Sequence, residues 1–278
     1  MSDTPVGQDE LDEWNQGQPH AVDLMGGPRS PVGCALLWCG WTVSAPDLLG
    51  NCFTCKTDLS VPAIRDLVAK EVNHPRTVAM PWAMCCKTLS RIRERPIEGH
   101  RNPPKPLRSV TEVMGLKELQ HPSRAKDLAR VTEANEIAEW GLDLMKKKCQ
   151  SGGLTFLENG KNSYIFDMPK CKQLLDNGCT DTLFDSCALE GARCKSERLR
   201  GNFPELHIDN AVCKHVHDTN EWKPVQRPDG SWYYPSEEEA EFTALLAFQG
   251  AGAIFFATIL ASSNPTGLQA RRDQSSRS

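Results

Sequence analysis

Short apolar runs that end in glycine, proline or acidic residues alternate along this chain with longer segments of helical period. Apolar residues at helical spacing mark residues 61–72, and residues 123–148 have the pattern of one long helix. The strand candidates are His20–Met25, Trp41–Ala45, Arg76–Met80, Gly153–Leu157 and Thr182–Ser186. This alternation predicts an α/β fold with a mostly parallel central sheet and helices on both faces. Such sheets bind ligands at the carboxyl ends of their strands.

Composition excludes several classes of protein. With 39% hydrophobic residues in 278, the chain can bury a core, and its net charge of −4 excludes a uniformly basic nucleic-acid coat. The 12 cysteines lack the dense, regular spacing of a small secreted protein. The segment Met1–Thr4 is polar and acidic, unlike the basic and then apolar start of a secretory signal. We therefore expect an intracellular protein with reduced thiols, nuclear or cytoplasmic. One domain over 20–262 is expected, between a disordered arm (1–19) and a disordered tail (263–278).

The segment Phe242–Ala261 admits two interpretations. It carries no charge and is about as long as a bilayer span, which would suit a tail anchor. Gln249 and the Gly250–Gly252 break instead suit a helix packed on protein, and acidic residues precede it, as they often do at a helix amino terminus in water. We expect a helix buried against the sheet, and no membrane partner.

Acidic residues and glycines follow the first strand candidates. Gly26 and Gly27 come directly after the first strand, where a backbone without side chains can approach a ligand closely. Asp47 follows the second strand, at the position where nucleoside-binding folds place an acid against ribose hydroxyls, and Asp58 follows the next turn. An ordinary Gly-Gly-Pro turn would explain the glycines equally well.

Two later strand candidates lead to residues that could be catalytic: a cysteine after the third strand candidate and a glutamate at the end of the fourth. Cys86 stands among Lys87, Arg91 and Arg93, and nearby cations lower a thiol's pKa and favour a nucleophilic thiolate. The alternative is a buried structural cysteine in a basic loop. Glu158 ends an apolar strand, where desolvation suits a carboxyl group to acid catalysis, unless it caps the following helix.

In this order, the fragments resemble the motifs of the cytosine-C5 DNA methyltransferase family. Asp23-Leu24-Met25-Gly26-Gly27 is similar to its first motif, Cys85–Ser90 to its catalytic loop and Glu158-Asn159-Gly160 to its Glu-Asn-Val. The resemblance implies a Rossmann-like methyltransferase fold with a small recognition-like insertion at 201–238, and S-adenosylmethionine as cofactor. It makes Cys86 the nucleophile and Glu158 the residue that holds the ring N3. The cofactor would lie near Asp23, Gly26, Gly27, Asp47 and Asp58, and the flipped nucleotide near Arg198 and Arg200.

The chain also departs from the family pattern. Cys85 replaces the proline before the nucleophile, Lys87 the following glutamine and Gly160 the valine, while Pro28-Arg29-Ser30 stands where further glycines are expected. A catalytically inactive, nucleic-acid-binding relative associated with a mobile element is therefore the alternative to an active enzyme.

Two further groups suggest binding. A basic loop suits contacts with nucleic-acid phosphates, most simply DNA bound by a monomer, although a solvated loop would look the same. Its cations are Arg91, Arg93, Arg95, Arg101, Lys105 and Arg108. Cys213, His215 and His217, with Cys187 and Cys194 upstream, suit zinc or one face of a strand. The sequence leaves that choice open, and we assign no metal from it.

Overall fold

The computed structural model is an α/β protein built on one six-stranded mixed sheet. It describes residues 18–94, 104–191, 193–202, 208, 211–218, 224–229, 232–233, 246–247 and 249–254. The strand order is β2-β1-β3-β4-β6-β5, and β1 to β4 pair in parallel. β6 runs antiparallel to both β4 and β5. The strands are β1 His20–Val22, β2 Thr42–Ser44, β3 Thr77–Ala83, β4 Leu154–Gly160, β5 Thr180–Asp185 and β6 Ser196–Gly201.

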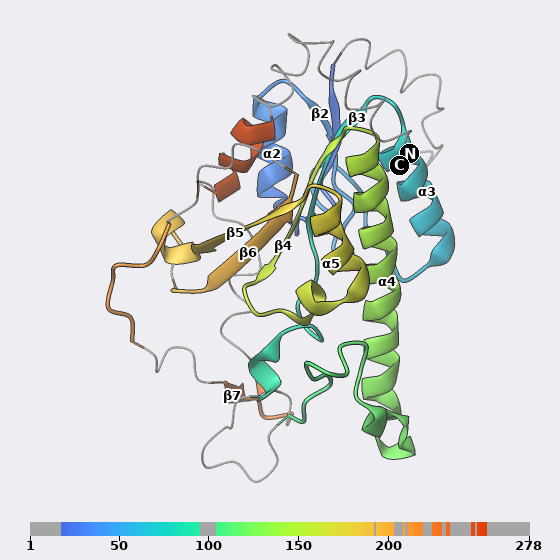
Figure 1. Cartoon of the computed structure of the whole chain (residues 1–278), viewed down its shortest axis with the longest axis vertical. Helices are drawn as coiled ribbons and strands as arrows, with labels where there is room; N and C mark the ends of the chain where they lie inside the picture. Colours follow the sequence, from blue (N-terminus) through green and yellow to red (C-terminus); the bar gives the residue numbers. More distant parts are fainter. Residues whose placement is uncertain are drawn as a thin grey trace.

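Helices cover both faces of this sheet (Figure 1). One face packs on α3 (Pro62–Asn73), α4 (Ala125–Gln150) and α5 (Pro169–Asp176), and the other on α2 (Pro31–Trp38). The predicted fold class is thereby confirmed as α/β with a mostly parallel sheet. Short 3-10 helices and a separate two-stranded ladder complete the described elements: η1 Arg91–Glu94, η2 Lys117–Gln120, η3 Pro122–Arg124, η4 Tyr164–Asp167, η5 Ser186–Leu189, β7 Val225–Gln226 and β8 Trp232–Tyr233.

The apolar segment near the carboxyl terminus packs on the α2 face of the sheet. Its described residues, 246–247 and 249–254, are helical, and Leu246, Ala251 and Ile254 are buried in the cluster that contains Phe156 of β4. For these residues the expected burial against the sheet is confirmed. Among the helices that the structure describes, none is long and apolar enough to cross a membrane.

Some domain expectations fall outside the described residues. These include residues 1–17 of the expected arm and the whole tail at 263–278. Of the expected insertion at 201–238, the structure describes the end of β6, Ile208, 211–218, and the β7 and β8 ladder with its neighbouring residues.

The centre of the core depends on close contact between β3 and α4. Trp82 of β3 is fully buried, and its indole ring lies against the backbone of Gly141 in α4. A Cβ atom at Gly141 would come within 2.4 Å of the Trp82 ring. Only glycine lets this helix approach the sheet so closely.

We therefore expect Gly141→Ala to lower the free energy of unfolding by about 1–3 kcal/mol, because the added methyl group overpacks the core. Urea denaturation measures this. Gly252→Ala is the matched control: among the described residues, no neighbouring atom lies within 4 Å of its added Cβ, so alanine there should stabilise its helix by up to about 1 kcal/mol. A Gly141→Ala protein as stable as the wild type would contradict the proposed packing.

Candidate active site at the carboxyl edge of the sheet

The candidate residues gather where the parallel strands end. β2 and β3 lie on opposite sides of β1, so the strand order of the sheet has a topological switch point between β1 and β3. Open α/β sheets bind ligands at such a point. Gly26 follows β1, Asp47 follows β2 and Cys86 follows β3. Glu158 lies near the carboxyl end of β4, where it pairs with Ala83 of β3. The expected convergence on one edge also included Asp58; the topology agrees with it for these four residues, and Asp58 lies in the turn before α3.

The loop that carries Cys86 is fixed from several sides. Asn159, next to Glu158 on β4, donates from Nδ2 to the Met84 carbonyl oxygen at 2.7 Å. The Tyr164 amide donates to the carbonyl oxygen of Leu89 at 2.9 Å, and Arg108 Nε donates to that of Thr88 at 2.9 Å. These hydrogen bonds hold the loop before and after Cys86.

Lys195 and Glu197 join Cys86 and Glu158 in one charged cluster. Glu197 of β6 pairs with Gly160, two residues beyond Glu158, so both carboxyl groups lie on the same face of the sheet. Lys195 Nζ forms an ion pair with Glu197 Oε1 at 2.5 Å. Burial and the neighbouring Glu158 carboxylate raise the pKa of Glu197 well above its ordinary value, and Lys195 opposes that rise.

The pKa of the Cys86 thiol is raised, whereas the cations next to it in the sequence predict that it is lowered. Burial raises the pKa of its thiol to about 11, and Glu158 and Glu197 add to the rise. The cation that lowers it is Lys195, not Lys87, Arg91 or Arg93. The expectation that neighbouring cations lower the pKa of the Cys86 thiol is therefore wrong, because desolvation outweighs the attraction of one ammonium group.

The first glycine turn is organised around Asp23. Ser30 Oγ and the Gly33 amide both donate to Asp23 Oδ2, at 2.6 and 3.1 Å. Burial raises the pKa of Asp23 to about 6. A Cβ atom at Gly26 would come within 2.3 Å of Oδ2, so glycine is required there.

Asp47 ties this turn to the end of β2. Its carboxylate accepts hydrogen bonds from the amides of Gly27 at 3.2 Å and Leu49 at 2.9 Å. Asp58 lies apart from this pair, in the turn before α3, where its exposed carboxylate accepts from the Ser60 amide at 2.9 Å. Hydrogen bonds from the Ser60 side chain and from the Ser60 amide lower the pKa of Asp58 and give it a local role in the turn.

The acceptors beside the glycine turn fit a ligand rich in hydrogen-bond donors. Among the described residues, none donates to the buried Oδ1 of Asp23. A buried carboxylate oxygen without a donor costs stability, and a bound donor would remove that cost. The ribose hydroxyls and the amine of S-adenosylmethionine, the cofactor implied by the resemblance, are donors of this kind.

Arg198 and Arg200 do not join the Cys86 cluster. Along β6 they alternate with Glu197 and Leu199, so their side chains lie on the opposite face. Arg200 is buried and forms a two-pronged ion pair with Asp181, with both N–O distances 2.7 Å. Arg198 contacts the same carboxylate, and both guanidinium groups lie over the Phe166 ring. Arg200 also donates to the Cys171 carbonyl oxygen of α5 at 2.9 Å, so Arg200 holds both α5 and η4 against the sheet, whereas Arg198 contacts η4 alone of the two.

The basic loop is less available to nucleic acid than its sequence suggests. Arg108 is almost fully buried, and its guanidinium donates to Thr88, to the Val113 carbonyl oxygen at 2.5 Å and to Asn135 Oδ1 at 2.7 Å. The expected phosphate contact by Arg108 is thus corrected to a structural role. Arg91 pairs with Asp167 at 2.7 Å and lies over the Tyr164 ring.

The remaining cations of the loop differ in what the structure says of them. Lys105 is exposed and Arg93 partly so. Arg95 and Arg101 lie outside the described residues. Lys105 and Arg93 are therefore the described cations of this loop that stay open to a phosphate.

Sequence reasoning missed Lys195, Glu197 and Asn159 as site residues. Lys195 directly precedes β6 and Glu197 lies within it, and this strand is too charged to resemble a core strand, so no apolar pattern marks either residue. Their one signal is the alternation of Glu197 and Leu199 with Arg198 and Arg200. Asn159 stands in the motif beside Glu158, but its hydrogen bond to Met84 depends on the pairing of β3 with β4.

A second group of side chains with metal-binding chemistry lies beyond the carboxyl end of β5. The ligand atoms of Cys187, Cys213, His215 and His217 lie within 4.8 Å of one another.

Comparison of the chain with protein-family models and with curated proteins finds no match. Function must therefore be argued from the two sites themselves.

The raised pKa of Cys86 predicts slow alkylation. At pH 7, iodoacetamide should modify the exposed Cys85 well before Cys86, and the rate at Cys86 should rise about tenfold per pH unit toward its pKa of about 11. Lys195→Met should slow Cys86 further, because the thiolate loses its stabilising cation, whereas Lys147→Met on the exposed side of α4 should not. Peptide mass spectrometry follows both cysteines; equal rates at pH 7 would contradict the structure.

Arg108 should matter for folding. We expect Arg108→Met to lower the free energy of unfolding by about 2–4 kcal/mol, because it leaves buried acceptors on Thr88, Val113 and Asn135 without their donor. Chemical denaturation measures the effect, and Lys105→Met, at an exposed position, is the control. A stable Arg108→Met protein with weakened DNA binding would instead restore the phosphate-binding interpretation.

Proposed function

We propose that the protein transfers a methyl group from S-adenosylmethionine to C5 of cytosine in DNA, with Cys86 as nucleophile. The observation that carries the proposal is the placement of Cys86 and Glu158 at the ends of the adjacent parallel strands β3 and β4. This is the arrangement required if a thiol and a carboxyl group are to act on one planar base. Glu158 is partly exposed at this edge, and so is Cys86.

The sheet itself supports the proposal by analogy. A strand that runs against its neighbours next to the edge strand of an otherwise parallel sheet, as β6 does between β4 and β5, is typical of the S-adenosylmethionine-dependent methyltransferase fold. Fold analogy does not establish activity, since one fold hosts many functions. The glycine turn with Asp23 and Asp47 would hold the cofactor, which when bound supplies the methyl group to C5.

The charged cluster provides a proton path for the reaction. A cytosine inside a duplex is unreachable, so the target base must leave the stack. In the proposal the Cys86 thiol passes its proton to the Glu158 and Glu197 pair as its sulfur bonds to C6. A carboxyl group of the same pair donates a proton to ring N3, which stabilises the electron pair displaced toward C5. Once C5 carries the methyl group, the C5 proton leaves to water and the C–S bond breaks with its electron pair on sulfur. The N3 proton returns to the carboxyl pair, and the pair returns one proton to the Cys86 thiolate.

Lys195 and Glu197 affect proton transfer in this cluster through the pKa values of its groups. Burial and the neighbouring Glu158 carboxylate raise the pKa of Glu197, and a raised pKa favours the protonated form of its carboxyl group. The Lys195 ammonium lowers the pKa of Cys86 against the effect of burial. Glu197 can therefore act as a proton donor, and Lys195 is the cation that favours the attacking Cys86 thiolate.

A second candidate function is a catalytically inactive module that binds nucleic acid. Two observations favour it: the Cys86 thiol has a raised pKa, and Asp47 is already engaged by amides of its own chain. Such a module would bind DNA with Arg93 and Lys105 and would transfer no methyl group. Activity separates the two candidates.

The test is incorporation of tritiated methyl groups into cytosine-containing DNA. Cys86→Ser should reduce incorporation at least about 10³-fold and leave calorimetric binding of S-adenosylhomocysteine unchanged, because the thiol acts on the base and not on the cofactor. Cys85→Ser, one residue away and exposed, is the matched control and should remain active. A fluorocytosine oligonucleotide should trap the wild type as a covalent adduct.

Two outcomes would overturn the proposal. Cofactor binding without incorporation or adduct, on single-stranded and duplex DNA alike, would favour the inactive module. Equal activity of Cys86→Ser and wild type would remove Cys86 from the mechanism.

A further inference from the structure

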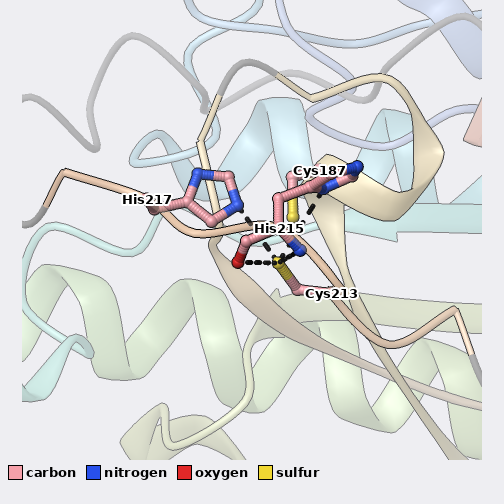
Figure 2. A group of neighbouring side chains, drawn as sticks. All are labelled: Cys187, Cys213, His215 and His217. Carbon is pink, nitrogen blue, oxygen red and sulfur yellow. Dashed lines mark hydrogen bonds between the residues drawn. The ribbon is translucent and has the colours of Figure 1, made fainter.

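Four metal-ligating side chains from two distant parts of the sequence converge beyond the carboxyl end of β5. Cys187 lies in η5, directly after β5, and the other three lie in the segment 211–218. Figure 2 shows the imidazole rings of His215 and His217 on either side of the Cys213 sulfur, with Cys187 facing the same point. The Cys213 sulfur lies 3.1 Å from His217 Nε2 and 4.0 Å from His215 Nδ1.

These two separations lie on either side of the spacing between ligands around one tetrahedral zinc ion. Zinc binds sulfur at about 2.3 Å and imidazole nitrogen at about 2.0–2.1 Å, so adjacent ligand atoms of a tetrahedral site lie roughly 3.3–3.8 Å apart. The four atoms here all lie within 4.8 Å of one another, and they require only small side-chain movements to surround an ion. A set of two thiolates and two imidazoles favours zinc over the harder cations magnesium and calcium.

The surrounding segment provides a second, independent observation. Residues 211–218 form no helix or strand, and their valines, Val212 and Val216, are exposed, with Val216 having essentially no contact that shields it from solvent. An ordered segment with so little apolar burial needs another source of stability. Cross-linking by a metal ion supplies it, as in small zinc-dependent folds.

Asp185, the last residue of β5, connects this segment to the sheet. Its carboxylate accepts from the Cys213 amide at 2.9 Å and from Ser196 Oγ of β6 at 2.5 Å. The Asp185 amide donates to the Ala211 carbonyl oxygen at 2.8 Å. One side chain therefore places the Cys213 ligand and the start of β6 relative to each other.

We propose that Cys187, Cys213, His215 and His217 bind a structural Zn²⁺ ion. The thiol of Cys194 also lies within hydrogen-bonding reach of Cys187 and Cys213. It stands outside the compact set of four, and four protein ligands already close a structural zinc site. The ion ties the segment 211–218 to η5 and so to the connection between β5 and β6.

This site has a consequence for the Cys86 cluster. The connection from η5 to β6 also carries Lys195, whose backbone amide and carbonyl oxygen both bond to Ser186 of η5. A metal ion on Cys187 restrains η5 and, through Ser186, the residue that pairs with Glu197. The zinc proposal itself does not depend on the proposed methyl transfer.

The first experiment measures metal content and coordination in the full chain. Purified without chelator, the protein should contain about one zinc ion, and X-ray absorption should show two sulfur ligands at about 2.3 Å and two nitrogen ligands at about 2.0–2.1 Å. Absence of zinc, with no uptake after reduction and addition of Zn²⁺, would overturn the proposal. So would a Cys187–Cys213 disulfide that persists in the reduced cell extract, or a shell of three sulfur atoms, which would replace His215 with Cys194.

Variants test the ligands individually. Cys213→Ser and His217→Ala should each raise the dissociation constant for zinc at least about 100-fold, whereas Cys55→Ser, an exposed cysteine outside the cluster, should not change it. Because a ligand variant can fail to fold, the wild type supplies an independent measurement. A zinc chelator should lower its melting temperature and expose 211–218 to proteolysis, and added Zn²⁺ should reverse both. Unchanged melting and proteolysis after complete zinc removal would overturn the structural role.

Discussion

The parallel pairing of β3 between β1 and β4 is the constraint on which the rest of the structure depends. It places Trp82 under the backbone of Gly141, and so fixes the distance between α4 and the sheet. The same pairing aligns Ala83 with Glu158, so that the loop after β3 leaves the sheet beside a carboxyl group. Core packing and site geometry therefore follow from one register.

Polar side chains then hold the loops that this register positions. Asn159 fixes the Met84 carbonyl oxygen, Arg108 fixes Thr88, and Asp185 joins the end of β5 to Cys213. Lys148, at the end of α4, is buried and donates from Nζ to the Thr77 carbonyl oxygen at 2.6 Å. Burial of such groups is favourable only when their hydrogen bonds are made, so these contacts specify loop positions that apolar packing alone would leave variable.

The two candidate sites lie at the same edge of the sheet and have different physical character. In the Cys86 cluster, desolvation and paired carboxyl groups set the protonation of the groups. In the Cys187 cluster, the spacing of soft ligands is what suits a cation. Because η5 and the start of β6 are joined through Ser186 and Lys195, order in the second site supports the geometry of the first.

The sequence by itself determined the fold class and where the first strands lie along the chain, because periodicity and strand-ending glycines are local properties. It also predicted that Gly26, Asp47, Asp58, Cys86 and Glu158 meet at one edge, since parallel strands end together. It could not determine which charges are buried. Arg108, Arg198 and Arg200 resemble surface cations in sequence, yet each is engaged by partners distant along the chain. Only the tertiary structure decided those partners, the raised pKa of Cys86 and the convergence of Cys187 with His217, because electrostatics and metal coordination depend on distance in space rather than along the chain.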